Sequence, residues 1–134
     1  LMPLAAYEDL SSFKLYFSDT GLFNSRLQLT KQSLAAARQY MGALTENYVA
    51  IQLKANGYKL NYWTSTATAE VDFVIVQNGE VVPIECKANI HVKSKSLDSF
   101  VKRYDIKQSI RLSMRNFGFE NNIKSVPLYA AFCV

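Results

Sequence analysis

Two acidic residues stand inside apolar runs in the stretch EVDFVIVQNGEVVPIECKA, residues 70–88. Asp72 belongs to the run before Asn78-Gly79, and Glu85 belongs to the run after it. An Asn-Gly pair between alternating apolar residues is typical of a two-residue type I′ hairpin loop, which predicts strands at 70–77 and 80–88. The register of this loop places Asp72 directly opposite Glu85, at a site where cross-strand side chains approach closely. The two carboxylates are therefore predicted to form a close pair.

A close pair of carboxylates needs compensation, because like charges repel and apolar surroundings strengthen the repulsion. Three arrangements would provide it: a proton shared by the pair, neighbouring cations, or a divalent metal ion between the two groups. The same register places Glu70 opposite Lys87, which makes a cross-strand ion pair feasible. Alternation along the strand also puts Lys87 beside Glu85, so one face of the hairpin is predicted to carry three acids and one amine.

The plainer alternative to a functional site is a solvated cluster of ion pairs on an exposed sheet face. Val74, Val76 and Val81 are predicted to share that face, and their apolar character indicates that the face is covered. Covered carboxylates need a positive partner. Oxygen ligands of this kind favour Mg²⁺, Mn²⁺ or Ca²⁺ over zinc, and a chain with a single histidine, His91, agrees with that choice.

A further acid, Glu46, is predicted to lie within a helix that spans residues 34–56. Val49, Ala50 and Leu53 follow it at helical spacing, so Glu46 heads an apolar stripe. A buried acid on a helix is more often a satisfied structural residue than a metal ligand. Because this helix precedes the acidic hairpin and is a candidate to cover it, Glu46 is also a candidate ligand.

The other elements are predicted from alternation, helical periodicity and turn residues. Strands are expected at 13–19, 58–63, 108–113 and 127–132, with a turn at "DTG" and an irregular loop before the last strand. Gly57 is expected to end the first helix, and a second helix is expected from its N-cap Ser96 to about Tyr104. The order after the first strand is helix, three strands, helix and two strands, which predicts an α/β sandwich around a mixed sheet flanked by helices.

Composition limits the class of protein. The chain has 134 residues, of which 49% are hydrophobic and 19% charged, and this is typical of one globular domain with its own core. No apolar run approaches the ~20 residues of a membrane-spanning helix, so we expect no membrane association and a cytoplasmic location. Cys86 and Cys133 predict neither a disulfide framework nor a zinc site. The chain does not begin with Met, and we expect it to be the C-terminal part of a longer protein.

Basic residues are concentrated after the acidic hairpin. Residues 87–115 contain eight Lys or Arg against two acids, within a chain of net charge +4. A nucleic-acid partner would need such a surface beside the acids, whereas the plainer interpretation is a solvated helix face. The candidate phosphate contacts are Lys93, Lys95, Lys102 and Arg103.

Glu46 on a helix, "EVD" with Asp72, and "IECKA" with Glu85 and Lys87 together resemble the PD-(D/E)xK nuclease superfamily, whose signature is an Asp on one strand and Glu-x-Lys on its hairpin partner. The predicted αβββαβ order over residues 34–113 is similar to the restriction-endonuclease-like core of that superfamily. More narrowly, "FKLYFSDTGLF", "ENYVAIQL", "YWTSTATAEVDFVI", "IECKAN" and "PLYAAF" resemble the C-terminal domain of unknown function that follows a AAA-type ATPase module in many prokaryotic proteins.

The resemblance implies a role for each matching residue. Asp72 and Glu85 would hold Mg²⁺ or Mn²⁺ together with the main-chain carbonyl of Cys86, and Glu46 would contribute directly or through a water. Lys87 would orient or activate the attacking water and stabilise charge in the transition state, while the metal neutralises the phosphodiester. The catalytic set implied by the resemblance is therefore Glu46, Asp72, Glu85 and Lys87.

Two function hypotheses follow. The first is a metal-dependent phosphodiesterase that cleaves DNA or RNA, of which DNA is the expected substrate. This enzyme would be coupled to its own N-terminal ATPase module, and ATP would act only through that module. The second is a catalytically silent module that binds nucleic acid or that ATPase, since a fold alone does not fix function. Glu70 would orient Lys87 or a water at the metal, and the intact acidic set favours the first hypothesis. Either hypothesis is compatible with a homo-oligomer.

Overall fold

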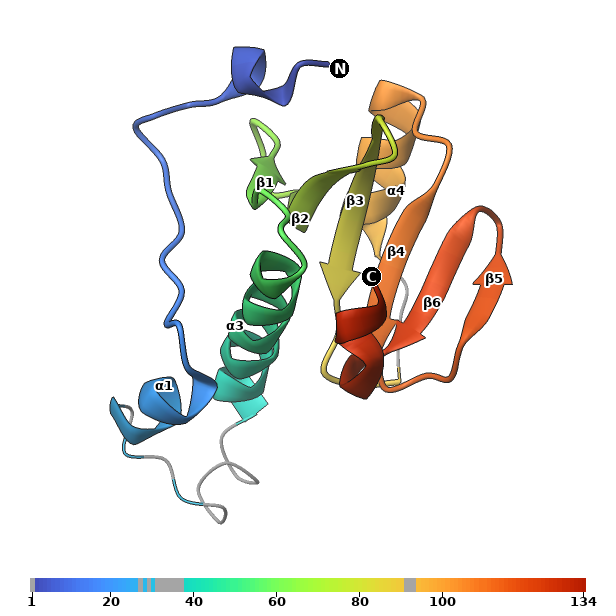
Figure 1. Cartoon of the computed structure of the whole chain (residues 1–134). Helices are drawn as coiled ribbons and strands as arrows, with labels where there is room; N and C mark the ends of the chain where they lie inside the picture. Colours follow the sequence, from blue (N-terminus) through green and yellow to red (C-terminus); the bar gives the residue numbers. More distant parts are fainter. Residues whose placement is uncertain (1, 27, 29, 31–37, 91–93) are drawn as a thin grey trace.

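A six-stranded mixed sheet forms the centre of the molecule, in a computed structural model that describes residues 2–26, 28, 30, 38–90 and 94–134. The strand order is β1-β2-β3-β4-β6-β5 (Figure 1). The strands are β1 (Asn61–Thr64), β2 (Glu70–Gln77), β3 (Glu80–Cys86), β4 (Ser109–Ser113), β5 (Gly118–Glu120) and β6 (Ile123–Pro127). Strands β3, β4 and β6 run parallel to one another, while the β1–β2, β2–β3 and β5–β6 pairs are antiparallel.

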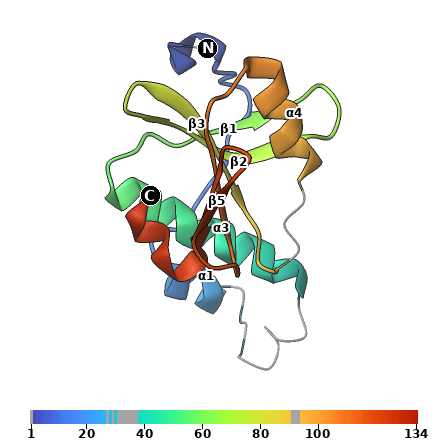
Figure 2. The ribbon, with the colours of Figure 1, turned by 90° about the vertical axis from the view of Figure 1, so that its right-hand side faces the viewer.

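Helices lie on both faces of this sheet. They are α1 (Thr20–Arg26), α3 (Arg38–Ala55) and α4 (Lys95–Tyr104), with the 3₁₀ helices η1 (Leu4–Tyr7) and η2 (Leu128–Cys133). On one face α3 and η2 pack on a core that includes Leu53, Ile84 and Leu112, and on the other face α4 packs through Phe100 (Figure 2). The predicted α/β class with a mixed sheet flanked by helices is confirmed, and from α3 to β4 the elements follow the order αβββαβ.

The β2–β3 hairpin has the predicted turn and register. Asn78 and Gly79 both have positive φ, 52° and 79°, as a type I′ loop requires. The paired residues run from Gln77↔Glu80 to Phe73↔Ile84 without a shift. The loop residues alone therefore determine how five consecutive pairs of the central hairpin face one another.

The N-terminal part differs from the prediction. Residues 13–19 were expected to form a strand, but they form no ladder with the sheet and run as an extended stretch beside α3 (Figure 1). Their attachments are made mainly by side chains: Asn47 of α3 accepts a hydrogen bond from the Phe17 N–H at 2.8 Å and donates one to its carbonyl at 3.2 Å. The expected "DTG" turn is instead the start of α1, where Asp19 accepts a hydrogen bond from the Leu22 N–H at 2.8 Å.

The long helix α3 agrees with the prediction over Arg38–Ala55, while residues 34–37 lie outside the described part of the chain. It ends as expected at Gly57, whose φ is 84°. The N–H of Tyr58 bonds to the carbonyl of Leu53 at 3.1 Å, which is the wide bond of a Schellman motif. This end of the helix delays the next strand, and β1 begins at Asn61 rather than at residue 58.

The predicted cap of α4 was wrong by two residues. Ser94, not Ser96, is the N-cap, and its side chain accepts a hydrogen bond from the Leu97 N–H at 3.1 Å. Ser96 Oγ instead accepts one from the Glu70 N–H at 3.3 Å. The side chain expected to start the helix therefore ties the first turn of α4 to the beginning of β2.

The C-terminal region contains two further corrections. The expected loop after residue 113 holds the β5–β6 hairpin, whose turn residues Asn121 and Asn122 have φ of 51° and 62°, so Asn-Asn replaces the Asn-Gly signal. The expected strand at 127–132 is the 3₁₀ helix η2, which buries Ala130 and Ala131 against the α3 side of the core. Residues 128–133 therefore contribute to the core by packing on the α3 side of the sheet and not by extending it. Within the described part of the chain no helix is both long and apolar enough to cross a membrane.

Candidate metal-binding site

A β-bulge in β2 sets the direction of Asp72. The β1–β2 ladder shifts register between Asn61 and Trp63, so that β2 uses three residue steps where β1 uses two. Val71 and Val74, three residues apart on β2, accordingly both pack toward α4. The extra residue between them breaks the alternation and lets Asp72 turn its carboxylate toward α3.

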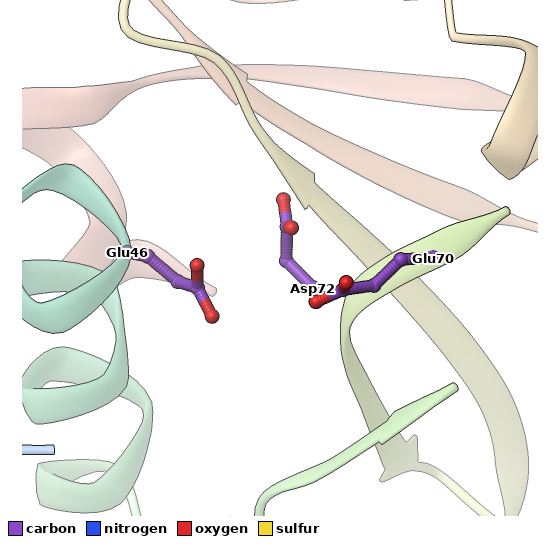
Figure 3. A group of neighbouring side chains, drawn as sticks. All are labelled: Glu46, Glu70 and Asp72. Carbon is purple, nitrogen blue, oxygen red and sulfur yellow. The ribbon is translucent and has the colours of Figure 1, made fainter. Parts of the chain in front are cut away.

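Three carboxylates converge between α3 and β2 (Figure 3). Glu46 comes from α3, Glu70 and Asp72 come from β2, and one oxygen from each lies within 4.8 Å of the other two. We call these three residues the carboxylate cluster. Sequence reasoning named all three, Glu46 and Asp72 as ligands and Glu70 as a supporting acid, and the fold brings them together.

A lysine that sequence reasoning missed lies in this cluster. Lys14 Nζ donates to Glu46 Oε1 at 2.8 Å and also pairs with Glu70. The hydroxyl of Tyr16 donates to the same Glu46 oxygen at 2.7 Å. The alternation of "FKLYF" does indicate that Lys14 and Tyr16 lie on the same side of this segment. Nothing in the sequence indicates that this side contacts α3.

The positions of these charges shift several pKa values. Burial raises the pKa of Asp72 to about 6; Glu46 and Glu85 add to the rise, whereas the hydrogen bond from the Cys86 N–H and the charge of Lys14 oppose it. Burial lowers the pKa of Lys14, but hydrogen bonds to Glu46 and Glu70 outweigh burial and leave that pKa above its ordinary value. The folded chain therefore holds a proton on Asp72 to a higher pH than an ordinary aspartate would.

Asp72 and Glu85 do not form the predicted cross-strand pair. The β2–β3 ladder ends at Phe73↔Ile84, because Asp72 Oδ2 accepts the Cys86 N–H at 2.7 Å, a donor that the next ladder bond would have used. Ile84 packs on the α3 side of the sheet, so alternation directs Glu85 to the α4 side, away from the carboxylate cluster.

Glu85 belongs to a second charged group. Its side chain is only 7% exposed, and its Oε1 lies 3.2 Å from Lys87 Nζ. Arg111 of β4 is its partner in the parallel β3–β4 register. Glu85 Oε2 and Arg111 Nε are both buried without a hydrogen-bond partner among the described residues.

The cross-strand ion pair between Glu70 and Lys87, which the predicted register made feasible, does not form in the structure. Glu70 pairs with Lys14, while Lys87 pairs with Glu85, two residues before it in the chain. The reason is that β3 leaves β2 at this point: the Lys87 N–H bonds to the carbonyl of Leu112 on β4 at 2.8 Å. The chain therefore carries the amine toward β4, away from the strand that bears Glu70.

Three of the four candidate phosphate contacts lie on α4. Lys95, Lys102 and Arg103 are exposed there, and Arg103 also lies over the ring of Tyr104, 5.6 Å from its centroid. Lys93 lies outside the described residues, as does His91.

Comparison with known protein families matches residues 41–131 to a domain of unknown function, DUF4143. The chain belongs to the DUF4143 family. Domains of this family commonly follow AAA ATPase modules, in agreement with the narrower of the two resemblances found in the sequence. The DUF4143 match includes the carboxylate cluster and Lys87, whereas Lys14 precedes it. No curated protein and no solved structure matches the chain.

Proposed function

We propose that this DUF4143 domain is a nucleic-acid phosphodiesterase that depends on Mg²⁺ or Mn²⁺ and that has a PD-(D/E)xK-like core. The observation that carries the proposal is the convergence of Glu46, Glu70 and Asp72, with one oxygen of each within 4.8 Å of the others. The αβββαβ order from α3 to β4 supports the proposed core. The association of the family with AAA ATPase modules supports coupling to an ATPase, through which ATP would act.

The donor set fits a hard divalent cation. All three groups are carboxylates, and opposite oxygen ligands of such an ion lie about 4 to 5 Å apart, which is close to the 4.8 Å span of the cluster. Glu46, Glu70 and Asp72 would hold the ion. Coordination by Glu85 as well, as the PD-(D/E)xK signature implies, would need its side chain to turn around the end of β3.

The bound cation would supply charge neutralisation for the phosphodiester and a lowered pKa for the attacking water. Asp72, whose pKa is about 6, is mostly ionised at neutral pH and so available as a ligand. Lys87 Nζ now lies 3.2 Å from Glu85, so it would have to leave this ion pair to bring its ammonium to charge that develops on phosphate oxygens at the cluster. The exposed bases of α4 would contact the phosphates of the bound strand.

A second candidate function is a catalytically silent module that binds nucleic acid or the ATPase. The contact between Lys14 and the carboxylate cluster favours it, because an ammonium already neutralises part of the charge that a metal would neutralise. In that case the cluster fastens the N-terminal segment to α3 and performs no chemistry. Metal binding separates the two functions.

The experiment is calorimetric titration of the chain with Mn²⁺ and Mg²⁺, using Asp72→Asn as the test variant and Asp105→Asn as the control. Asp105 is an exposed acid at the end of α4, far in sequence from the cluster. Binding that is lost only in Asp72→Asn supports the metal site and justifies cleavage assays on DNA and RNA, with Lys87→Ala as the inactive reference. A chain that binds neither ion overturns the phosphodiesterase and leaves the silent module.

A further inference from the structure

The ammonium of Lys14 occupies the position in which a cation would bind the carboxylate cluster. It contacts both Glu46 and Glu70, and its side chain is 22% exposed. A metal ion coordinated by the same two carboxylates would compete with this ammonium for their negative charge and for Glu46 Oε1 and Glu70 Oε1, the oxygens that Lys14 contacts. Lys14 and a metal ion are therefore competitors for the cluster.

Lys14 is carried by a segment with little apolar anchorage, residues 8–17, which we call the N-terminal strap. Leu10, Phe13 and Leu15 point away from the sheet and are 90%, 73% and 85% exposed. On the inner side, Tyr16 packs its ring against Phe73 at a centroid distance of 5.7 Å. Polar contacts with α3 and the Lys59–Glu8 ion pair supply most of the remaining attachment.

Charge balance favours exchange of Lys14 for a divalent ion. One ammonium leaves three converging carboxylates with a net charge of about −2, whereas a divalent ion reduces that excess further and bonds directly to the oxygens. An ion pair that is partly open to solvent contributes little net stability, so its loss is a small cost against metal coordination. The displaced ammonium has solvent and the ring of Tyr62, now 5.1 Å from it, as alternative surroundings.

We propose that Lys14 is a built-in counter-ion of the carboxylate cluster, which a divalent cation must displace before the site is loaded. The inference rests on the proposed metal-dependent function and adds its regulation. Any event that lifts the N-terminal strap from α3 raises the apparent affinity of the cluster for metal, because it removes the competing charge. At low metal concentration, Lys14 therefore occupies the carboxylate cluster in place of the metal ion.

The first test uses the unmodified chain and measures how fast its lysines are acetylated, by mass spectrometry, with and without saturating Mn²⁺. Lys14 is expected to react slowly without Mn²⁺ and several-fold faster with it. Lys59, 70% exposed and attached to the same strap through Glu8, is the internal reference and is expected to react at one rate throughout. Unchanged reactivity of Lys14 at Mn²⁺ concentrations that saturate the site by calorimetry overturns the proposal.

The second test compares Mn²⁺ affinity in Lys14→Met, Lys14→Arg and the control Lys59→Met. Lys14→Met is expected to bind Mn²⁺ roughly tenfold tighter than the natural chain. Lys14→Arg and Lys59→Met are expected to bind Mn²⁺ with the affinity of the natural chain. Equal affinity in Lys14→Met and the natural chain refutes the counter-ion role and leaves the metal site intact. Absence of Mn²⁺ binding in both refutes the proposed function, and the counter-ion role with it. If Lys14→Met does not fold, the acetylation measurement decides alone.

Discussion

Replacement of Asp72 by Asn should stabilise the domain at neutral pH, against the usual direction of a substitution at a partly buried position. The substitution removes the charge while keeping nearly the same shape. Asn Oδ1 can still accept the hydrogen bond that the Cys86 N–H now donates to Asp72 at 2.7 Å. What changes is the cost of holding an ionised carboxylate near Glu46 in a partly buried place.

The size of the effect follows from the pKa of Asp72, which is about 6 in the folded chain against an ordinary value of 3.8. A difference of about two pKa units corresponds to about 3 kcal/mol of folding free energy. Because the folded-state pKa is raised, the folded chain binds more protons than the unfolded chain between pH 4 and pH 6. The free energy of unfolding contributed by Asp72 therefore falls as pH rises through that window, and the full cost is present above about pH 7.

The assay is urea unfolding of the natural chain and of Asp72→Asn from pH 4 to pH 8, with a chelator present. The two chains should differ little near pH 4, and Asp72→Asn should become more stable by up to about 3 kcal/mol at pH 7.5. Asp105→Asn, which neutralises an exposed acid, should show no such divergence. Added Mn²⁺ should reverse the order, because a ligand that binds only the native site stabilises only the chain that retains it.

A constant difference between the two chains across this pH range would refute the electrostatic reasoning about Asp72. So would a loss of stability in Asp72→Asn at pH 7.5, which would mean that the hydrogen bond to Cys86 needs a charged acceptor more than burial penalises the charge. Either outcome would also weaken the view that Asp72 is retained at a cost to the fold.

Three further predictions concern individual contacts. Tyr16→Phe should lower the free energy of unfolding by about 1 to 2 kcal/mol, because the hydroxyl donates to the charged Glu46; an unchanged melting curve would mean that water replaces this contact. Ser94→Ala should cost about 1 kcal/mol in the same assay, since it removes the N-cap of α4, and a neutral effect would contradict the cap. Burial and nearby carboxylates raise the pKa of the Cys86 thiol, so at pH 8 a disulfide reagent should label exposed Cys133 first and Cys86 only on unfolding; two fast thiols would contradict this.

The sequence predicts the central hairpin well because local residues determine it. Asn78 and Gly79 favour the loop conformation, the loop determines the register, and five pairs of the ladder follow it. The helix α3 is equally local in origin, with a periodic apolar stripe and a glycine at its end. The structure of a short segment can be predicted from a single sequence when the segment itself contains the residues that begin and end it and a regular apolar pattern.

The failures occur where a distant element decides. Residues 13–19 alternate like a strand, but they pair with no strand and are held by contacts from Glu46 and Asn47 on α3. The bulge at Asp72 arises from pairing with β1, which no pattern within 70–77 reveals. That bulge separates Asp72 from Glu85, so the predicted acidic residues were identified but their division between the two faces of the sheet was not.

The arrangement of charge in the domain is costly for a purely structural cluster. Asp72 is ionised at neutral pH only against burial, and Glu85 Oε2 and Arg111 Nε are buried without partners among the described residues. Apolar side chains of similar volume would often serve stability as well or better. Departures from local consistency are expected where a fold carries a function, and here they lie around the ends of β2 and β3.

Lys14 offsets only part of this electrostatic cost, because its two ion pairs are made with Glu46 and Glu70, while Asp72 accepts its hydrogen bond from the Cys86 N–H. A divalent cation is the simplest addition that would satisfy all three carboxylates of the cluster, and this is the physical reason to measure metal binding before cleavage.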